Sequence, residues 1–290
     1  MTQIICVGAM LWDIIGRVPG RLRRGADAPG AVERRPGGVA LNVALALARA
    51  GFRPRMLSAV GRDVEGAALI RHVRRHGLDC SVADRSASAT DRYVAVEDAG
   101  GLVSAVADTG ALAAAGTAIL APLRDGRITQ PFEGIAVIDG NLSPAVLCAV
   151  ATDPALSAAD LRVVSASANK APGLLPLLAH PRATFYLNRA EAEALSGIPG
   201  PDADSAARAV VACGAARAVV TDGAAACADA DRMTTVRALP RSARPARVTG
   251  AGDAFVAAHL AAELRGIGRD GALAAALAAA HDHITQDLRP

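Results

Sequence analysis

The chain has 290 residues, of which 52% are hydrophobic and 20% are charged, and its formal net charge is +3. This composition excludes a disordered protein, and the small, scattered positive charge argues against a nucleic-acid-binding protein. The length suits one α/β domain, while five separated cysteines and the lack of a signal peptide or a bilayer-length apolar run predict a soluble cytoplasmic protein with no membrane partner.

The first predicted elements are a buried strand and an alanine-rich helix. The apolar run at 4–8 (IICVG) predicts the strand, and residues 39–50 predict the helix. Between them, residues 14–36 are rich in Gly, Pro and Arg, which indicates a segment that leaves the core. A strand at 53–61, a helix at 64–77 and an antiparallel hairpin at 92–108 are expected next.

The second half alternates predicted strands with apolar helical stretches. The strands are expected at 134–141, 161–167, 183–188 and 216–223, each followed by a helix. Repeated strand–helix units predict a parallel sheet with helices on both faces, and ligands of such sheets bind at the carboxyl ends of the strands. The polar or small residues that fall at those ends are Asp139, Asn141, Asn188, Thr221 and Gly223.

Residues 249–253 (TGAGD) stand directly before a helix with apolar periodicity. Glycines at 250 and 252 allow a turn that directs successive N–H groups to one point, and the first turn of a helix leaves such donors unpaired. The segment therefore predicts an anion hole. Asp253 could act only as a helix cap, or it could accept a proton from a hydroxyl group that attacks a bound phosphate. The chain contains no Walker loop, so the phosphate site would be of another design.

Three stretches together resemble the signature regions of the PfkB (ribokinase-like) family of sugar and nucleoside kinases: PGGVALNVA, AVGRDVEG and TGAGDAF. The resemblance covers essentially the whole chain. Within the family, VTGAGDA, LNRAEAEALSGI, AVIDGN and ASANK are most similar to the pseudouridine kinases. The resemblance implies a single α/β domain over 1–290, with a ribokinase-like three-layer α/β/α fold and a mainly parallel central sheet. It also implies a small β-sheet lid, formed by about 14–36 and 91–109, that doubles as a homodimer interface.

The residues that the resemblance assigns to the acceptor substrate are Asp13, Gly37, Gly38, Asn42 and Asn141. The aspartate would accept hydrogen bonds from a ribose diol, and the asparagine at 42 would bind sugar hydroxyls. The two glycines would let the backbone approach the ribose closely. A turn residue at Asp13 and a helix cap at Asn42 are the alternatives.

The resemblance makes Asp253 the general base for the 5′-hydroxyl of a ribosyl substrate. The backbone of Gly250, Ala251 and Gly252 would stabilise the phosphoryl group that leaves ATP. Glu191 would hold Mg²⁺, mainly through water, and a solvated helix residue is its alternative. The residues assigned to ATP and its phosphates are Lys170, which is the only lysine of the chain, Asn188, Thr221 and Gly223.

The expected activity is ATP-dependent phosphorylation of pseudouridine. Two alternatives stay open: the same chemistry on a free sugar such as ribose or fructose or on another nucleoside, and a non-catalytic relative that binds a nucleoside or sugar. A requirement for a monovalent cation also stays open. The chain departs from the pseudouridine kinases at Leu11 and Val164, and from most of the family at Arg247. Trp12 and Tyr93 could stack on a base or pack in the core.

Overall fold

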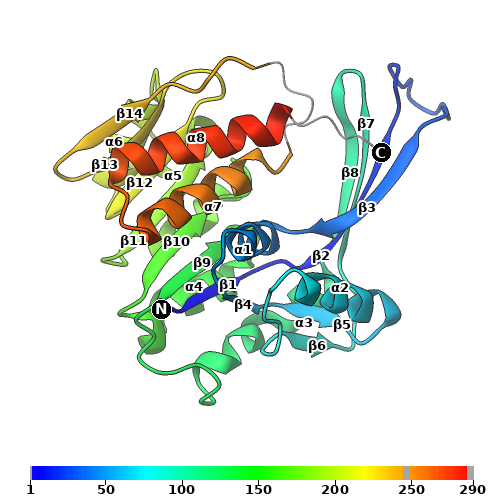
Figure 1. Ribbon diagram of the computed structural model, residues 1–290, viewed down its shortest axis with the longest axis horizontal. Helices are drawn as coiled ribbons and strands as arrows, with labels where there is room; N and C mark the ends of the chain where they lie inside the picture. Colours follow the sequence, from blue (N-terminus) through cyan, green and yellow to red (C-terminus); the bar gives the residue numbers. More distant parts are fainter. Residues whose placement is uncertain (1, 244–248, 286–290) are drawn as a thin grey trace.

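The computed structural model describes residues 2–243 and 249–285, which form two main sheets and the helices packed on them (Figure 1). The larger sheet has the strand order β14-β13-β12-β11-β10-β9-β1-β4. The strands from β4 to β12 are parallel, and β13 and β14 run antiparallel to their neighbours. The strands are β1 (Ile4–Val7), β4 (Pro54–Leu57), β9 (Ile135–Asp139), β10 (Asp160–Val164), β11 (Ala183–Asn188), β12 (Arg217–Thr221), β13 (Cys227–Asp231) and β14 (Thr235–Ala238).

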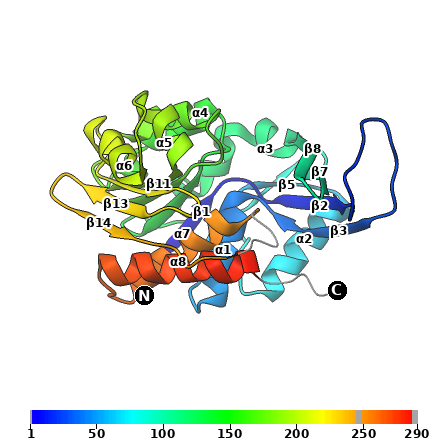
Figure 2. The same cartoon turned by 90° about the horizontal axis from the view of Figure 1, so that it is seen from above.

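Apolar side chains fill both faces of this sheet. In β1, Ile5 and Val7 belong to one hydrophobic cluster, and Ile4 and Cys6 belong to the other. Strands buried on both faces read as continuous apolar runs, which is why the sequence predicts them well. Figure 2 shows helices on each side of the sheet, so the predicted three-layer architecture is confirmed. The helices on one side are α4 (Pro144–Thr152), α5 (Arg189–Ser196) and α6 (Ala203–Ala212), and on the other α1 (Val39–Arg49), α7 (Ala251–Leu264) and α8 (Arg269–Thr285).

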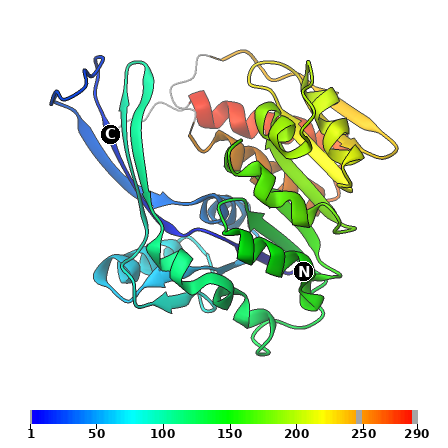
Figure 3. The same cartoon turned by 180° about the vertical axis from the view of Figure 1, so that it is seen from behind.

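The smaller sheet has the strand order β3-β2-β7-β8 and extends away from the main body (Figure 3). Its strands are β2 (Leu11–Arg17), β3 (Ala31–Gly37), β7 (Arg92–Asp98) and β8 (Gly101–Asp108). The predicted antiparallel hairpin at 92–108 is present as β7 and β8. The sheet begins at Leu11, three residues before the expected start, because Leu11 already pairs with Gly37 across β2 and β3.

Three local predictions were wrong. The predicted strand at 53–61 is divided: β4 joins the larger sheet, whereas β5 (Ala59–Gly61) pairs with β6 (Asp84–Ser86). The segment after β10 is a 3₁₀ helix, η3 (Ala171–Leu177), where Pro172 and Pro176 remove two backbone donors. The segment after β12 is the hairpin of β13 and β14 instead of a helix. The remaining elements are α2 (Val64–Arg75), α3 (Gly110–Ala115), η1 (Gly116–Leu123) and η2 (Pro154–Leu156).

Within the described ranges, the helices are too short or too polar to cross a lipid bilayer. All five cysteines have free thiols, and three of them are buried. The carboxyl ends of β1 and β9 lie next to each other in the larger sheet and adjoin the loops that lead into β2 and α4. This arrangement places the candidate site at the edge between the two sheets.

Candidate active site

The N-terminus of α7 forms an open turn. Gly250 caps the helix with φ +92° and ψ −3°, a left-handed conformation that favours glycine. Ala254 donates its N–H to the carbonyl of Gly250 at 3.0 Å, so the N–H groups of Ala251, Gly252 and Asp253 have no acceptor within the helix. A Cβ atom built on Gly252 would meet no atom within 4 Å. The turn can therefore present backbone donors, and the positive end of the helix dipole, to an anion.

Asn42 and Asp253 are joined directly. Asn42 lies in the first turn of α1, and its Nδ2 donates to Oδ2 of Asp253 at 2.8 Å. The N-caps of α1 and α7 are Gly38 and Gly250, and neither helix has a side-chain cap. The helix-cap alternatives for Asn42 and Asp253 are therefore wrong. Two residues that lie 211 positions apart meet because α1 packs beside α7.

The surroundings of Asp253 favour its protonated form. Burial raises the pKa of the Asp253 carboxyl to about 7, the hydrogen bond from Asn42 opposes that rise, and the charges of Asp139 and Asp13 add to it. A carboxyl group with a pKa near neutrality is suited to accept a proton in the working pH range.

Asp139 is fully buried at the end of β9 and connects the surrounding loops. Its carboxylate accepts hydrogen bonds from the N–H of Ala9 at 3.0 Å, of Ala40 at 3.4 Å and of Asn141 at 2.8 Å. Burial raises the pKa of Asp139, and these donors oppose the rise. The Asn141 side chain also donates to Asp139 at 2.9 Å and accepts from Nζ of Lys170 at 2.7 Å. Asn141 and Lys170 are thus placed beside the loop that begins α1.

Asp13 lies within β2 and is 8% exposed, so the turn-residue alternative is wrong. Nε of Arg35 lies 3.5 Å from Oδ2 of Asp13. Burial raises the pKa of Asp13, and Arg35 opposes that rise. A Cβ atom on Gly37 would overlap the Asp13 carboxylate, and one on Gly38, where φ is +105°, would overlap the backbone carbonyl of Ala9. Gly37 is therefore required by its close approach to Asp13, and Gly38 by its close approach to Ala9 and by its positive φ.

Trp12 and Tyr93 have different surroundings. Trp12 is 7% exposed, and the guanidinium of Arg34 lies 4.3 Å from its ring centroid. Because successive strand residues point to opposite faces, Trp12 and Asp13 lie on opposite sides of β2, and Trp12 packs in the core. Tyr93 is the cross-strand neighbour of Asp13 and shares its face. Leu11 is also buried in the core.

A second group of predicted residues lies at the ends of β11 and β12. The Asn188 side chain accepts from the N–H of Glu191 at 2.9 Å, and Oε2 of Glu191 accepts from the N–H of Asn188 at 2.8 Å. Glu191 is 7% exposed, so the solvated alternative is wrong, and burial raises its pKa. Thr221 is the sheet neighbour of Asn188, and Gly223 follows in a turn. Among the described residues, no hydrogen bond or ion pair connects this group with Asp253.

Glu191 could bind Mg²⁺ only as a single carboxylate ligand, with the other ligands coming from water or substrate. In the part of the chain that the structure describes, no group of three or more His, Cys, Asp or Glu side chains could hold a metal ion. Mg²⁺ commonly binds through one carboxylate and completes its coordination with water and substrate phosphates. Glu191 is thus suited to orient a hydrated magnesium ion that the phosphates of a nucleotide also bind.

Three residues near the site had no assigned role in the sequence analysis. Asp139 was predicted only to lie at the carboxyl end of a buried strand, with no role of its own. Arg35 could not be paired with Asp13 without the register of β2 and β3. No motif in the sequence pointed to His283. In the structure, its Nε2 lies 2.9 Å from the carbonyl oxygen of Thr249. Arg247 lies outside the described residues.

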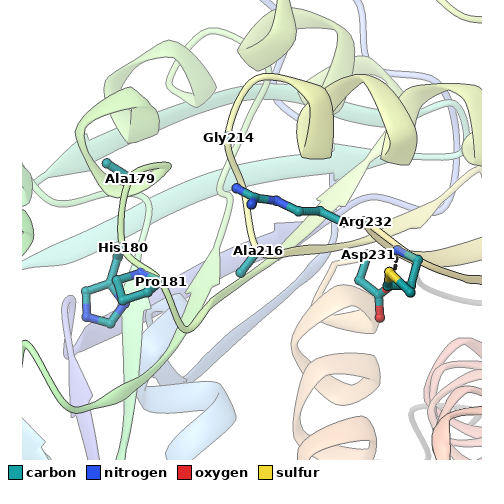
Figure 4. A pocket seen from close by; sticks show the side chains of 8 residues that line it. Ala179, His180, Pro181, Gly214, Ala216, Asp231 and Arg232 are labelled. Atoms are coloured by element: carbon teal, nitrogen blue, oxygen red, sulfur yellow. Dashed lines mark hydrogen bonds between the residues drawn. The ribbon is translucent and has the colours of Figure 1, made fainter.

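Two cavities lie away from these residues. One, of about 450 Å³, is near the amino ends of β11 and β12, opposite the strand ends discussed above (Figure 4). Its lining residues are Ala179, His180, Pro181, Gly214, Ala216, Asp231, Arg232 and Met233. The other, of about 310 Å³, lies between α1, α7 and α8 and is lined mainly by alanine. Neither cavity includes Asp253.

Comparisons with known proteins identify the fold and the family. A carbohydrate kinase from Agrobacterium tumefaciens is 27% identical, with a TM-score of 0.79 over 97% of this chain and 90% of that chain. A ribokinase from Arabidopsis thaliana, complexed with ribose and ATP, is 19% identical, with a TM-score of 0.79 over 98% and 92% of the two chains. An adenosine kinase from Sinorhizobium meliloti is 18% identical, with a TM-score of 0.78 over 100% and 96%.

No curated protein sequence matches the chain. Residues 1–286, however, match the model of the pfkB family of carbohydrate kinases. That match covers nearly all of the chain, including both sheets and the Gly250–Asp253 turn. The protein therefore belongs to the pfkB carbohydrate kinase family, whose members transfer a phosphoryl group from ATP to an alcohol.

Proposed function

We propose that the protein transfers the γ-phosphoryl group of ATP to the 5′-hydroxyl of a ribosyl substrate, with pseudouridine as the first candidate. The observation that supports this proposal most strongly is the contact between Asn42 and Asp253 beside the open turn of α7. Asp253 directly follows the Gly250–Gly252 turn, so under this proposal the proton acceptor stands next to backbone donors that can bind an anion. Phosphoryl transfer to an alcohol needs both functions at one point.

In the proposed reaction, the Asp253 carboxylate removes the proton from the 5′-hydroxyl as the oxygen attacks the γ-phosphorus. The bond from phosphorus to the bridging oxygen breaks, and ADP leaves. The N–H groups of Gly250, Ala251 and Gly252 stabilise the negative charge on the transferring group, and Lys170 assists from the phosphate side. Removing one donor of this kind typically costs roughly 3–4 kcal/mol in the transition state.

Asp13, Asn42 and Asn141 are proposed to hold the ribosyl unit. Asp13 lies in β2 of the smaller sheet and Asn42 lies in α1. Hydrogen bonds from these two positions to the hydroxyl groups of the acceptor would orient it towards Asp253. Asn188, Thr221 and Gly223 are proposed to border the nucleotide, and Glu191 to orient Mg²⁺. When bound, magnesium would neutralise phosphate charge. Dependence on a monovalent cation is tested by replacing potassium with tetramethylammonium in the assay.

The smaller sheet is proposed to act as a lid, formed by about 14–36 and 91–109, and as a homodimer interface. Asp13 lies on one face of it. On the opposite face, Val32, Val94 and Val106 are exposed, and Val94 is the cross-strand neighbour of Val106. A second copy of the chain would cover these side chains. Sedimentation at micromolar protein should give twice the mass of the chain, and a monomer would contradict the interface.

The choice of acceptor rests on the resemblance to pseudouridine kinases. We also propose a cytoplasmic location, which the five free thiols support. To test the acceptor, pseudouridine, uridine, adenosine, ribose and fructose are each incubated with the protein, ATP and Mg²⁺. The release of ADP is measured for each compound. Pseudouridine should give the highest kcat/KM. If a free sugar or another nucleoside is turned over faster, that compound replaces pseudouridine as the proposed acceptor. If no acceptor is turned over, the result supports a non-catalytic protein that binds a nucleoside or sugar.

Asp253→Asn tests the chemical role. It should leave the binding of ATP and acceptor near normal while kcat falls by about 10²–10⁴, the usual contribution of a general base. The matched control is Asp282→Asn, which removes an exposed carboxylate at the end of α8. Asp253→Asn with more than about a tenth of the wild-type kcat would exclude the general-base role.

A further inference from the structure

We propose that His283, near the C-terminal end of α8, is a positioning residue that fixes the Thr249–Gly250 peptide at the start of α7 for phosphoryl transfer. This inference rests on the proposed function, because it concerns the same open turn. It adds a residue from a different helix to that site. Figure 1 shows the end of α8 beside the start of α7, since the two helices run in opposite directions.

The His283 ring makes two contacts with this turn. Its Nε2 lies 2.9 Å from the carbonyl oxygen of Thr249, and because a carbonyl only accepts, Nε2 must carry the proton and donate. A Cβ atom built on Gly250 would lie 3.0 Å from Nε2 and 3.1 Å from Cε1 of the same ring. The ring therefore packs against the left-handed residue that caps α7.

The geometry of the peptide group links the His283 contact to the proposed anion site. A trans peptide is planar, and its C=O and N–H bonds point in opposite directions. Holding the oxygen of Thr249 in place therefore fixes the direction of the Gly250 N–H, which points away from the histidine. Gly250 N–H is the first of the backbone donors proposed to stabilise the transferring phosphoryl group. A small rotation of this peptide would turn the donor away from the charge.

No side chain of α7 itself performs this task. The helix lacks a side-chain cap hydrogen bond, and its capping residue is a glycine with wide conformational freedom. Without an anchor, the peptide before Gly250 could rotate at little cost. A hydrogen bond from His283 supplies the anchor from α8. The ring does not exchange a proton with the substrate in this role.

Kinetics of three variants test the proposal. His283→Ala should lower kcat about fivefold to tenfold, the range expected for loss of one hydrogen bond that acts in the transition state, with the acceptor KM unchanged. His283→Gln should recover most of kcat, because the glutamine amide can donate an N–H at similar reach. The acid limb of kcat, which reports Asp253, should stay at the same pH in both variants.

His281→Ala is the matched control, because it removes the same ring from the same end of α8. The His281 ring makes no hydrogen bond to any described residue. Its kcat should remain at the wild-type value. Equal kcat values for His281→Ala and His283→Ala would overturn the proposal. So would a glutamine variant no better than alanine, or a rise in KM with kcat unchanged.

Hydrogen–deuterium exchange gives a readout that needs no activity. His283→Ala should speed exchange in the peptide that covers 249–254, whereas His281→Ala should not. Unchanged exchange would overturn the proposal even for a protein without measurable turnover. Asp253→Asn separates this inference from the proposed function. If that variant loses kcat and His283→Ala does not, only the role of His283 fails; if Asp253→Asn stays active, the general base fails.

Discussion

Replacing Asn42 by alanine should move the pH dependence of the reaction. The Asn42 amide donates to Asp253 at 2.8 Å and favours the ionised carboxylate, whose pKa burial raises to about 7. A hydrogen bond to a charged acceptor is worth about 1.5–3 kcal/mol, and one pKa unit corresponds to about 1.4 kcal/mol. Losing the amide should therefore raise the pKa of Asp253 by about 1–2 units.

The sign of the effect follows from which form is active. Asp253 accepts a proton only when ionised, so kcat falls as the pH drops below its pKa. In Asn42→Ala, the acid limb should move to higher pH by about 1–2 units. At pH 7, about half of the wild-type carboxyl is ionised, against roughly 1–10% in the variant. The expected loss of kcat at pH 7 is therefore about 5–50-fold, with recovery above pH 9.

The assay is kcat for ADP release between pH 5.5 and 9.5, at saturating ATP and acceptor. Saturation matters because Asn42 is also proposed to bind the acceptor, and its loss would raise KM. Asn169→Ala is the matched control, since Asn169 is exposed and has no hydrogen bond to Asp253. An acid limb in Asn42→Ala at the wild-type pH, or at lower pH, would refute the assigned contact or the role of Asp253.

Two further predictions concern acceptor binding and stability. Gly37→Ala should raise the acceptor KM more than tenfold, because its Cβ would overlap the Asp13 carboxylate; an unchanged KM would remove Asp13 from the acceptor site. Burial lowers the pKa of His259 from 6.5 to about 4, so between these pH values the unfolded chain binds a proton that the folded chain does not. The free energy of unfolding should therefore fall by about 2–3 kcal/mol between pH 7.0 and 4.5 on account of this residue. His259→Gln should lack that part of the decline in urea unfolding, and an equal decline in both proteins would contradict it.

The fold could be predicted well where one local signal was sufficient. The strands of the larger sheet that are buried on both faces are short apolar runs, and the first-half helices begin after glycine- or aspartate-containing turns. The hairpin of β13 and β14 gave no such signal. In Cys227–Asp231, the side chains that enter the core are mostly alanine. Alanine is the strongest helix former and is depleted in strands, so this segment favoured the helix that was expected there.

The candidate site could be predicted residue by residue but not as an arrangement. Asp253 and Asn42 each stand in a distinctive local pattern, but only the structure, which places the N-caps at Gly38 and Gly250, removed the helix-cap alternatives. The contact between the two side chains depends on the packing of α1 on α7. Arg35 contacts Asp13 because of the register between β2 and β3, which local sequence does not specify. His283 reaches Thr249 through the packing of two helices. Contacts of this kind depend on the distance between elements, and no short motif encodes that distance.

The contact between α1 and α7 also sets the order in which a working site can assemble during synthesis. A growing chain that has left the ribosome as far as β14 already contains Asp13, Asn42 and Asp139. It still lacks Asp253, which arrives with α7 among the last described helices. Under the proposed function, a chain that lacks α7 could bind a ribosyl compound but could not activate its hydroxyl group. Phosphoryl chemistry would begin only after α7 has been translated and has packed against α1.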